Sequence, residues 1–232
     1  ARGVLNPAFK EAFEDGLIIR NPFAFELSKV VVNETAKKNA LTSRQERLFL
    51  NFIKQDNHFH IYYNGILILL RTGLRISEFC GLTVNDIDLE NKVIHVRHQL
   101  QRVSNMAMEM SEILKTDSAR RDIPMTEDVY NAFVSILTDV SNRTCNPTVD
   151  GYSDFLYLDK NNMPMVGMHW EKYFNHIVEK YNKIYKEELP NITPHICRNT
   201  CLTNWAKNGM QPAQLKYFAG HSEISLTYEY YV

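Results

Sequence analysis

The sequence predicts an α+β domain that is mainly α-helical and carries one small antiparallel β-sheet. Helical spacing of apolar residues dominates beyond residue 40, residues 92–99 alternate like a strand, and proline and glycine punctuate short helices near the C-terminus. The composition agrees, because 44% hydrophobic and 23% charged residues over 232 positions are globular values that exclude disordered, collagen-like and coiled-coil classes.

The N-terminal region is predicted to be the end of another domain. Apolar residues at helical spacing predict a helix from Phe9 to Ile18, and the pair Asn21-Pro22 stops it. Residues 23–38 have the character of an extended linker. We therefore expect residues 1–35 to be the last helix and linker of an upstream domain, and residues 36–232 to form the main domain.

Helices are predicted to follow up to residue 81. Ser43 and Glu46 have the spacing of a capping box that opens a helix over residues 44–55. The strongly apolar stretch 60–70 predicts a core helix that ends at Gly73, and residues 75–81 predict a short helix.

The middle of the chain holds the predicted strands. In residues 92–99, Ile94, Val96 and His98 lie on one face of the expected strand. Two more strands are expected around residues 112–115 and 121–125, joined by a polar turn at 116–120. The other predicted elements are helices, at residues 126–140, 170–184, 193–208, 212–220 and 225 to the end.

Several classes of protein are excluded or disfavoured by simple patterns. No apolar run approaches the length of a membrane span, and the N-terminus has no secretory signal pattern. The four cysteines form no CxxC pair, which favours reduced cytosolic thiols over a disulfide frame or a zinc site. No acidic cluster or HExxH spacing indicates a metal-dependent nuclease, so no metal or other cofactor is expected.

The charge distribution permits a focused anion site. With 26 basic and 27 acidic residues the net charge is −1, which disfavours a broadly basic surface. The stretch KTDSARR at 115–121 concentrates Lys115, Arg120 and Arg121 against one carboxylate. We expect Arg120 and Arg121 to contact DNA, although a solvated turn is the more common role of such a cluster.

Two further patterns suit phosphate binding. His195 and Arg198 share a face in the first turn of a predicted helix, where free N–H groups and the helix dipole favour anions. Arg75 follows a glycine-ended helix, and Glu78 one turn later can hold it by a charged pair. Each pattern alone is more often a satisfied histidine or an exposed ion pair.

The types and order of these residues resemble the tyrosine recombinase, or phage-type integrase, family. The stretches that carry the resemblance are TGLRISEFCGLTVNDID (72–88), LKTDSARRDIPM (114–125), TPHICRNT (193–200) and GHSEISLTYEYY (220–231). The segment at 150–175 is similar to integrases of conjugative transposons. The resemblance covers residues 36–232 as a catalytic domain, and residues 1–35 look like the end of the family's core-binding domain.

The resemblance implies six catalytic residues: Arg75, Lys115, His195, Arg198, His221 and Tyr231. The two arginines would grip the scissile phosphate and Lys115 would protonate the leaving oxygen, while Glu78 supports the first arginine. The pattern of residues 227–231 favours Tyr231 as nucleophile, with Tyr230 as second choice. Two departures are noted: Asn199 stands where the family usually has histidine, and the chain ends one residue after Tyr231, which suggests trimming and impaired assembly.

By this resemblance the protein is a site-specific recombinase or transposon integrase that cleaves and rejoins DNA through a 3′-phosphotyrosine intermediate, without metal or ATP. Its implied partners are double-stranded DNA, at transposon ends or attachment sites, and further copies of itself, from dimer to tetramer. The expected location is the bacterial cytoplasm, associated with the nucleoid. The alternatives are a type IB topoisomerase-like enzyme and a non-catalytic helix-turn-helix regulator.

Overall fold

The computed structural model describes residues 2–24, 40–103, 107–112 and 120–231. The chain divides into two compact units, Ala1–Lys38 and Asn39–Val232. The first holds helix α1 (Arg2–Glu14), in which the ring of Phe9 packs edge-on against Phe23. The predicted helix therefore begins earlier than expected and ends before residue 18, and most of the predicted linker lies outside the described residues.

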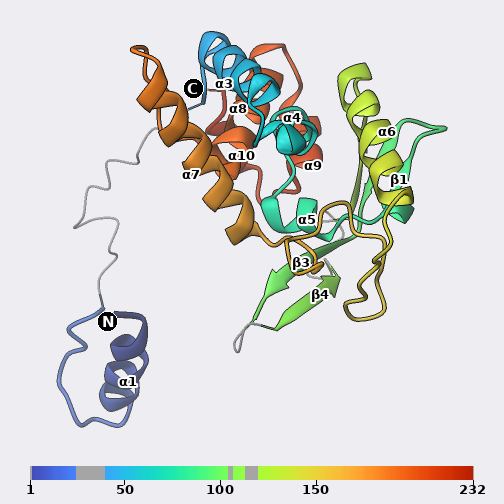
Figure 1. Ribbon diagram of the computed structural model, residues 1–232. Coiled ribbons are helices and arrows are strands. Elements are labelled where there is room, and N and C mark those ends of the chain that lie inside the picture. The colour runs from blue at the N-terminus through green and yellow to red at the C-terminus, as the bar shows by residue number, and fades with distance from the viewer. Residues whose placement is uncertain (1, 25–39, 104–106, 113–119, 232) are drawn as a thin grey trace. The chain divides into compact units, whose positions relative to one another are not determined.

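The second unit is built mainly from helices, in the order α3 (Ser43–Gln55), η1 (His60–Tyr62), α4 (Tyr63–Thr72), α5 (Ile76–Gly81), η2 (Val84–Asp86), α6 (Glu127–Ser141), α7 (Gly167–Ile184), α8 (Pro194–Lys207), α9 (Pro212–Ala219) and α10 (Ser225–Tyr228). Helix α4 is its centre, because it packs against α3, α6 and α8 (Figure 1). Its apolar residues are buried almost all round, which explains the continuous apolar run that predicted a core helix.

The helix ends follow the proline and glycine signals in most cases. Thr193 caps α8 through its side chain with Pro194 in the first turn, and α9 ends at Gly220 as predicted. The capping box of α3 was predicted one residue too late. Thr42 and Gln45 form it, because Thr42 has the extended backbone that a cap requires, while Glu46 instead accepts a hydrogen bond from Arg71.

The strands are antiparallel as predicted, but they form two small sheets where one was predicted. Strands β1 (Ile87–Asp88), β2 (Val93–Val96) and β5 (Arg121–Pro124) form one antiparallel sheet in the order β1-β2-β5, while β3 (His98–Arg102) and β4 (Met108–Glu112) form a second. The expected strand at 92–99 is broken at Arg97, and β5 pairs with β2. Of the expected strand at 112–115 and turn at 116–120, residues 113–119 lie outside the described residues.

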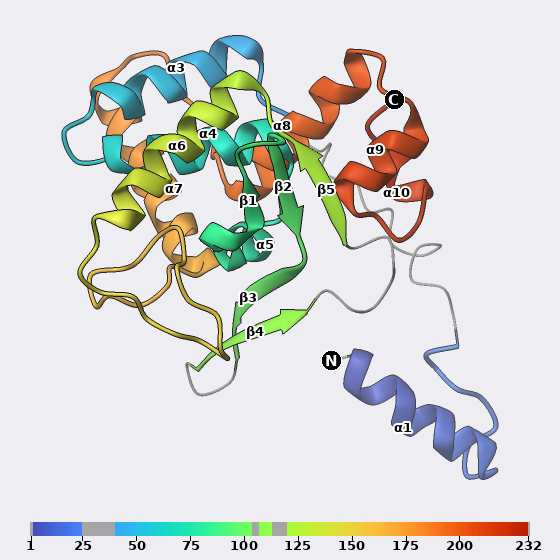
Figure 2. The same cartoon turned by 90° about the vertical axis from the view of Figure 1, so that its right-hand side faces the viewer.

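Two apolar clusters hold this unit together. The larger one fills the space between the sheet and helices α3, α4, α6 and α7. A smaller one joins α8, α9 and the C-terminal segment through Leu202, Ala206, Leu215, Ala219 and Tyr230. Figure 2 shows α9 and α10 beyond β5, on the other side of the sheet from α6. The C-terminal segment is thus packed beside the strand that carries Arg121.

Candidate active site

Arg75 stands at the start of α5, where the chain leaves the glycine-ended helix α4. Its backbone N–H donates to Glu78 Oε2 at 2.8 Å, and its guanidinium donates from Nη1 to Glu78 Oε1 at 2.7 Å and from Nη2 to the carbonyl of Gly220 at 2.7 Å. The side chain is 39% exposed. The carboxylate of Glu78 therefore fixes Arg75 on its buried side, while part of the guanidinium remains accessible to solvent.

Arg198 lies on the buried side of α8 and is 6% exposed. Its guanidinium donates to the carbonyl of Gly73, and to that of Ala219 at 2.6 Å. Burial and the nearby positive charge of Arg75 lower the pKa of Arg198 to about 10. The group still carries its charge at neutral pH, and burial is the larger cause of the lowered pKa, with the charge of Arg75 second.

Glu78 is the carboxylate at the centre of this field. It is 1% exposed and accepts hydrogen bonds from both Arg75 and Arg121. Burial alone raises its pKa, but the positive charge of Arg121 in particular, with those of Arg75 and Arg198, lowers the pKa of Glu78 to about 2. Glu78 is therefore ionised, and three guanidinium groups around one carboxylate leave the cluster net positive.

Arg121 does not occupy the place expected of a DNA contact. Its side chain is 1% exposed and forms a bidentate pair with Glu78, at 3.0 and 2.7 Å, while Nε donates to the carbonyl of Phe218 at 2.7 Å. A sequence signal for this burial exists, because Arg121 and Ile123 alternate on one face of β5 opposite Val96 and Ile94 of β2.

The three arginines meet at the end of α9. Consecutive carbonyls of this helix end each accept a hydrogen bond from a different guanidinium: Phe218 from Arg121, Ala219 from Arg198 and Gly220 from Arg75. The last carbonyls of a helix lack partners within the helix and form the negative end of its dipole, so they are natural acceptors for cations. Arg75 and Arg198, far apart in sequence, are thereby brought to neighbouring backbone groups.

The segment after α9 adds an imidazole and a phenol to the cluster. His221 is buried, its Nδ1 lies 3.0 Å from Thr227 Oγ1, and its ring stacks on that of Tyr230 with centroids 6.1 Å apart. The hydroxyl of Tyr230 donates to Asn199 Oδ1 at 3.1 Å. Asn199 follows Arg198 on α8, so the residue that departs from the family pattern is the one that holds this phenol.

The remaining predicted site residues are Tyr231, His195, Arg120 and Lys115. Tyr231 is 38% exposed and its hydroxyl donates to the carbonyl of Met210, away from the contacts of its neighbour Tyr230. His195 is exposed in the first turn of α8, and Arg120 is exposed and pairs with Glu112 at 2.9 Å. Lys115 lies outside the described residues.

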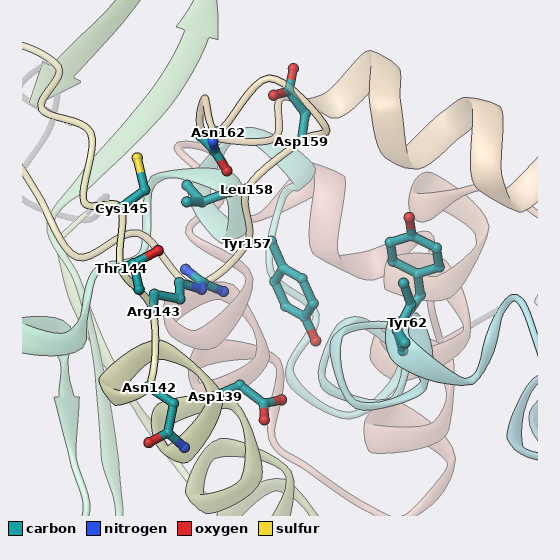
Figure 3. A pocket seen from close by; sticks show the side chains of 11 residues that line it. Tyr62, Asp139, Asn142, Arg143, Thr144, Cys145, Tyr157, Leu158, Asp159 and Asn162 are labelled. Atoms are coloured by element: carbon teal, nitrogen blue, oxygen red, sulfur yellow. The ribbon is translucent and has the colours of Figure 1, made fainter.

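A cavity of about 460 Å³ lies elsewhere, between the end of α6, the following loop and η1 (Figure 3). The guanidinium of Arg143 extends under this loop and donates to the carbonyls of Phe155 and Leu156, so it fastens the loop to the end of α6. Residues of the arginine cluster do not line this cavity.

Comparisons with known proteins identify the family to which this chain belongs. Residues 39–232 match the protein family described as "Phage integrase family". The chain is 42% identical over 227 residues to the transposase from transposon Tn916 of Enterococcus faecalis, covering 98% of this chain but only 56% of that protein. It thus spans little more than half of that relative's length.

Solved structures give the same result. The integrase of transposon Tn1549, in complex with a circular intermediate DNA, is 44% identical and superposes with a TM-score of 0.89, over 98% of this chain and 72% of that one. The XerA recombinase, 20% identical with a TM-score of 0.63 over 83% of this chain and 59% of that one, shares the fold. The comparisons give no support to a topoisomerase or a non-catalytic regulator. Every helix among the described residues is too short or too polar to span a membrane.

Proposed function

This chain belongs to the phage integrase family of tyrosine recombinases, and from that premise we propose that it is the catalytic part of a transposon integrase. The proposed reaction cleaves one DNA strand and rejoins it to another through a 3′-phosphotyrosyl intermediate. One observation carries the proposal above all: Arg75 and Arg198 converge on adjacent carbonyls at the end of α9, beside His221 and Tyr230.

The proposed role of the two arginines follows from the charge of a phosphodiester. In-line attack adds negative charge to the nonbridging oxygens of a pentavalent phosphorus. Forked guanidinium groups bind such oxygens with two parallel hydrogen bonds and neutralise the added charge. When DNA binds, its phosphate replaces part of the carbonyl contacts of Arg75 and Arg198, and Glu78 keeps Arg75 oriented during that exchange.

The remaining residues handle the protons and the covalent bond. The phenol oxygen forms a bond to phosphorus as the bond from phosphorus to the 5′-oxygen breaks. One of the two imidazoles, of His195 or His221, accepts the phenol proton while both position the phosphate, and Lys115 gives a proton to the departing 5′-oxygen. Attack by a 5′-hydroxyl of another strand reverses the same step, so no external energy source enters the reaction.

Two adjacent tyrosines are candidates for the nucleophile. The spacing of residues 227–231 favours Tyr231, while Tyr230 stacks on His221 and donates to Asn199. We propose Tyr231 as the nucleophile, with Tyr230 as second choice, because Tyr231 is 38% exposed whereas Tyr230 is buried in the smaller apolar cluster. In the proposed reaction the hydroxyl of Tyr231 leaves the carbonyl of Met210 to reach the phosphate.

A suicide duplex, nicked so that the released strand diffuses away, tests the proposal. The protein should become covalently attached to the DNA, as measured by a shift in denaturing electrophoresis. Tyr231→Phe should abolish the adduct while leaving DNA binding nearly intact, because only a hydroxyl is lost. The matched control is Tyr228→Phe, the same change at a tyrosine that is 51% exposed, and it should form the adduct normally.

The outcomes separate the alternatives. An adduct that persists in Tyr231→Phe and disappears in Tyr230→Phe transfers the nucleophile to Tyr230. Failure of the unaltered protein to form any adduct, while it binds the duplex, contradicts the proposed function itself.

The proposed partners and location rest on the relatives. We propose that the substrate is double-stranded DNA at transposon ends or attachment sites, because the Tn1549 integrase is described in complex with such DNA. We further propose that copies of the chain act together on that DNA, as dimers or tetramers. The corresponding location is the cytoplasm of a bacterium, on its nucleoid.

A further inference from the structure

The buried guanidinium of Arg121 has no part in the proposed reaction, yet it is the most extensively enclosed charge of the cluster. It belongs to the first residue of β5 and is among the largest fully buried side chains of the described chain. A buried charge is costly unless it is paired and hydrogen-bonded. Arg121 meets that requirement with two bonds to Glu78 and one to the carbonyl of Phe218.

The pairing with Arg121 determines how Glu78 can hold Arg75. Arg121 occupies both carboxylate oxygens with two of its nitrogens, so Arg75 is left with one guanidinium bond to Oε1. Without Arg121, Glu78 is free to turn and form a fork-to-fork pair with Arg75, the geometry that arginine and carboxylate prefer. Such a pair withdraws from Arg75 the nitrogens that would bind a phosphate.

Arg121 also contacts the end of α9, which leads into the C-terminal part of the site. Its bond to the carbonyl of Phe218 fixes the end of α9, whose next two carbonyls contact Arg198 and Arg75. His221 follows directly, and Tyr230 lies nine residues after it. One side chain therefore connects the carboxylate behind the first phosphate-binding arginine to the segment that carries the imidazole and the phenol.

We propose that Arg121 is a positioning residue for DNA cleavage, which acts through Glu78 and the end of α9 and does not touch DNA. The proposal rests on the proposed function and assigns to Arg121 a part in the rate of cleavage and not in DNA affinity. It replaces the expectation that the basic stretch 115–121 meets DNA with both of its last two arginines.

Single-turnover cleavage of the suicide duplex, at saturating protein, tests this role. Arg121→Lys keeps a positive charge but cannot reach both Glu78 oxygens and the Phe218 carbonyl at once. It should fold, bind DNA with an affinity within about tenfold of the unaltered protein, and form the adduct about 100-fold more slowly, since small displacements of reacting groups have effects of that size. The control is Arg44→Lys on α3, which breaks a bidentate, solvent-exposed pair between Arg44 and Glu187. The cleavage rate of this variant should not change.

A double-mutant cycle shows whether Arg121 acts through Glu78. If it does, Glu78→Gln also slows cleavage, and the double variant Arg121→Lys/Glu78→Gln is no slower than the slower single variant. If Arg121→Lys does not fold, Arg121→Gln/Glu78→Gln takes its place, because it removes both buried charges together.

The results that overturn the proposal are distinct from those that overturn the function. A folded Arg121 variant that cleaves at the normal rate refutes the positioning role, as do losses that multiply in the double variant. Loss of DNA affinity in proportion to the loss of rate returns Arg121 to a DNA contact. Absence of cleavage by the unaltered protein contradicts the recombinase function and the positioning role together.

Discussion

At the scale of single residues, the site is a set of arginines distinguished by their exposure. Arg75 is partly exposed, Arg198 is almost buried and Arg121 is fully enclosed, although all three contact the same helix end. Exposure therefore distinguishes Arg75 and Arg198, which are proposed to bind a phosphate, from Arg121, which is proposed to position them. The carboxylate of Glu78 is kept ionised by the surrounding arginines and accepts hydrogen bonds from both Arg75 and Arg121.

Substitution Arg75→Lys tests the role of the guanidinium fork. Lysine retains the charge, but it offers one compact ammonium in place of two parallel donors and cannot contact Glu78 and a phosphate in the same way. We expect covalent adduct formation to slow by about 100-fold or more, as when one donor to a transition-state oxyanion is removed. Adduct formation is measured under single-turnover conditions, with DNA affinity as the control, and an unchanged rate removes Arg75 from the site.

The sequence predicted most of these residues but not how they are shared. Arg75, Glu78, Arg198 and His221 were expected in one site, and the structure brings them together. Arg121 was assigned to the DNA surface because a basic run indicates charge without indicating burial. The alternation of Arg121 with Ile123 in a strand was the overlooked signal. The partnership of Asn199 with Tyr230 depends on packing between α8 and the C-terminal segment, which no local pattern encodes.

At the scale of secondary-structure elements, the end of α9 is the feature on which the site is assembled. The helix stops at Gly220, whose φ of 62° lies in the left-handed region, and a Cβ there would lie 3.0 Å from Nη1 of Arg121 and 3.1 Å from Nη1 of Arg75. Glycine is required both by the backbone conformation and by the closeness of two guanidinium groups.

A pair of alanine substitutions separates these two requirements. Gly209→Ala, at a φ of 86° with no atom within 4 Å of the added Cβ, should cost only the left-handed strain, about 1–2 kcal/mol of unfolding free energy. Gly220→Ala should cost more than that and should also slow adduct formation, because Arg75 and Arg121 must shift. Denaturant unfolding and single-turnover cleavage measure both effects, and equal effects of the two variants contradict the assembly of the site on this helix end.

Elements with local signals were predicted well, whereas the pairing of strands distant in sequence was not predicted. Proline, glycine and capping residues placed the ends of α4, α8 and α9, because these signals act within one helical turn. The partner of β5 could not be read from its sequence. Its register with β2 joins residues 25 to 31 positions apart, and the common burial of Ile94 and Ile123 selects that register.

At the scale of the whole molecule, a chain of net charge −1 gathers three of its arginines around Glu78 in the described part of the structure. The larger apolar cluster holds α5 and the sheet, from which Arg75 and Arg121 extend, and the smaller one attaches the C-terminal segment with Tyr230. The arginine cluster lies where these two parts meet. Cleavage chemistry therefore depends on how the C-terminal segment docks against the rest of the catalytic unit.

The most direct test is a crystal structure of the protein bound to a nicked duplex that contains its cleavage site. The account predicts that the guanidinium groups of Arg75 and Arg198 both lie within about 3 Å of oxygens of the same scissile phosphate, with a C-terminal phenol opposite the leaving oxygen and Arg121 still on Glu78. A scissile phosphate held by other residues, with Arg75 and Arg198 still occupied by the carbonyls of α9, would contradict it.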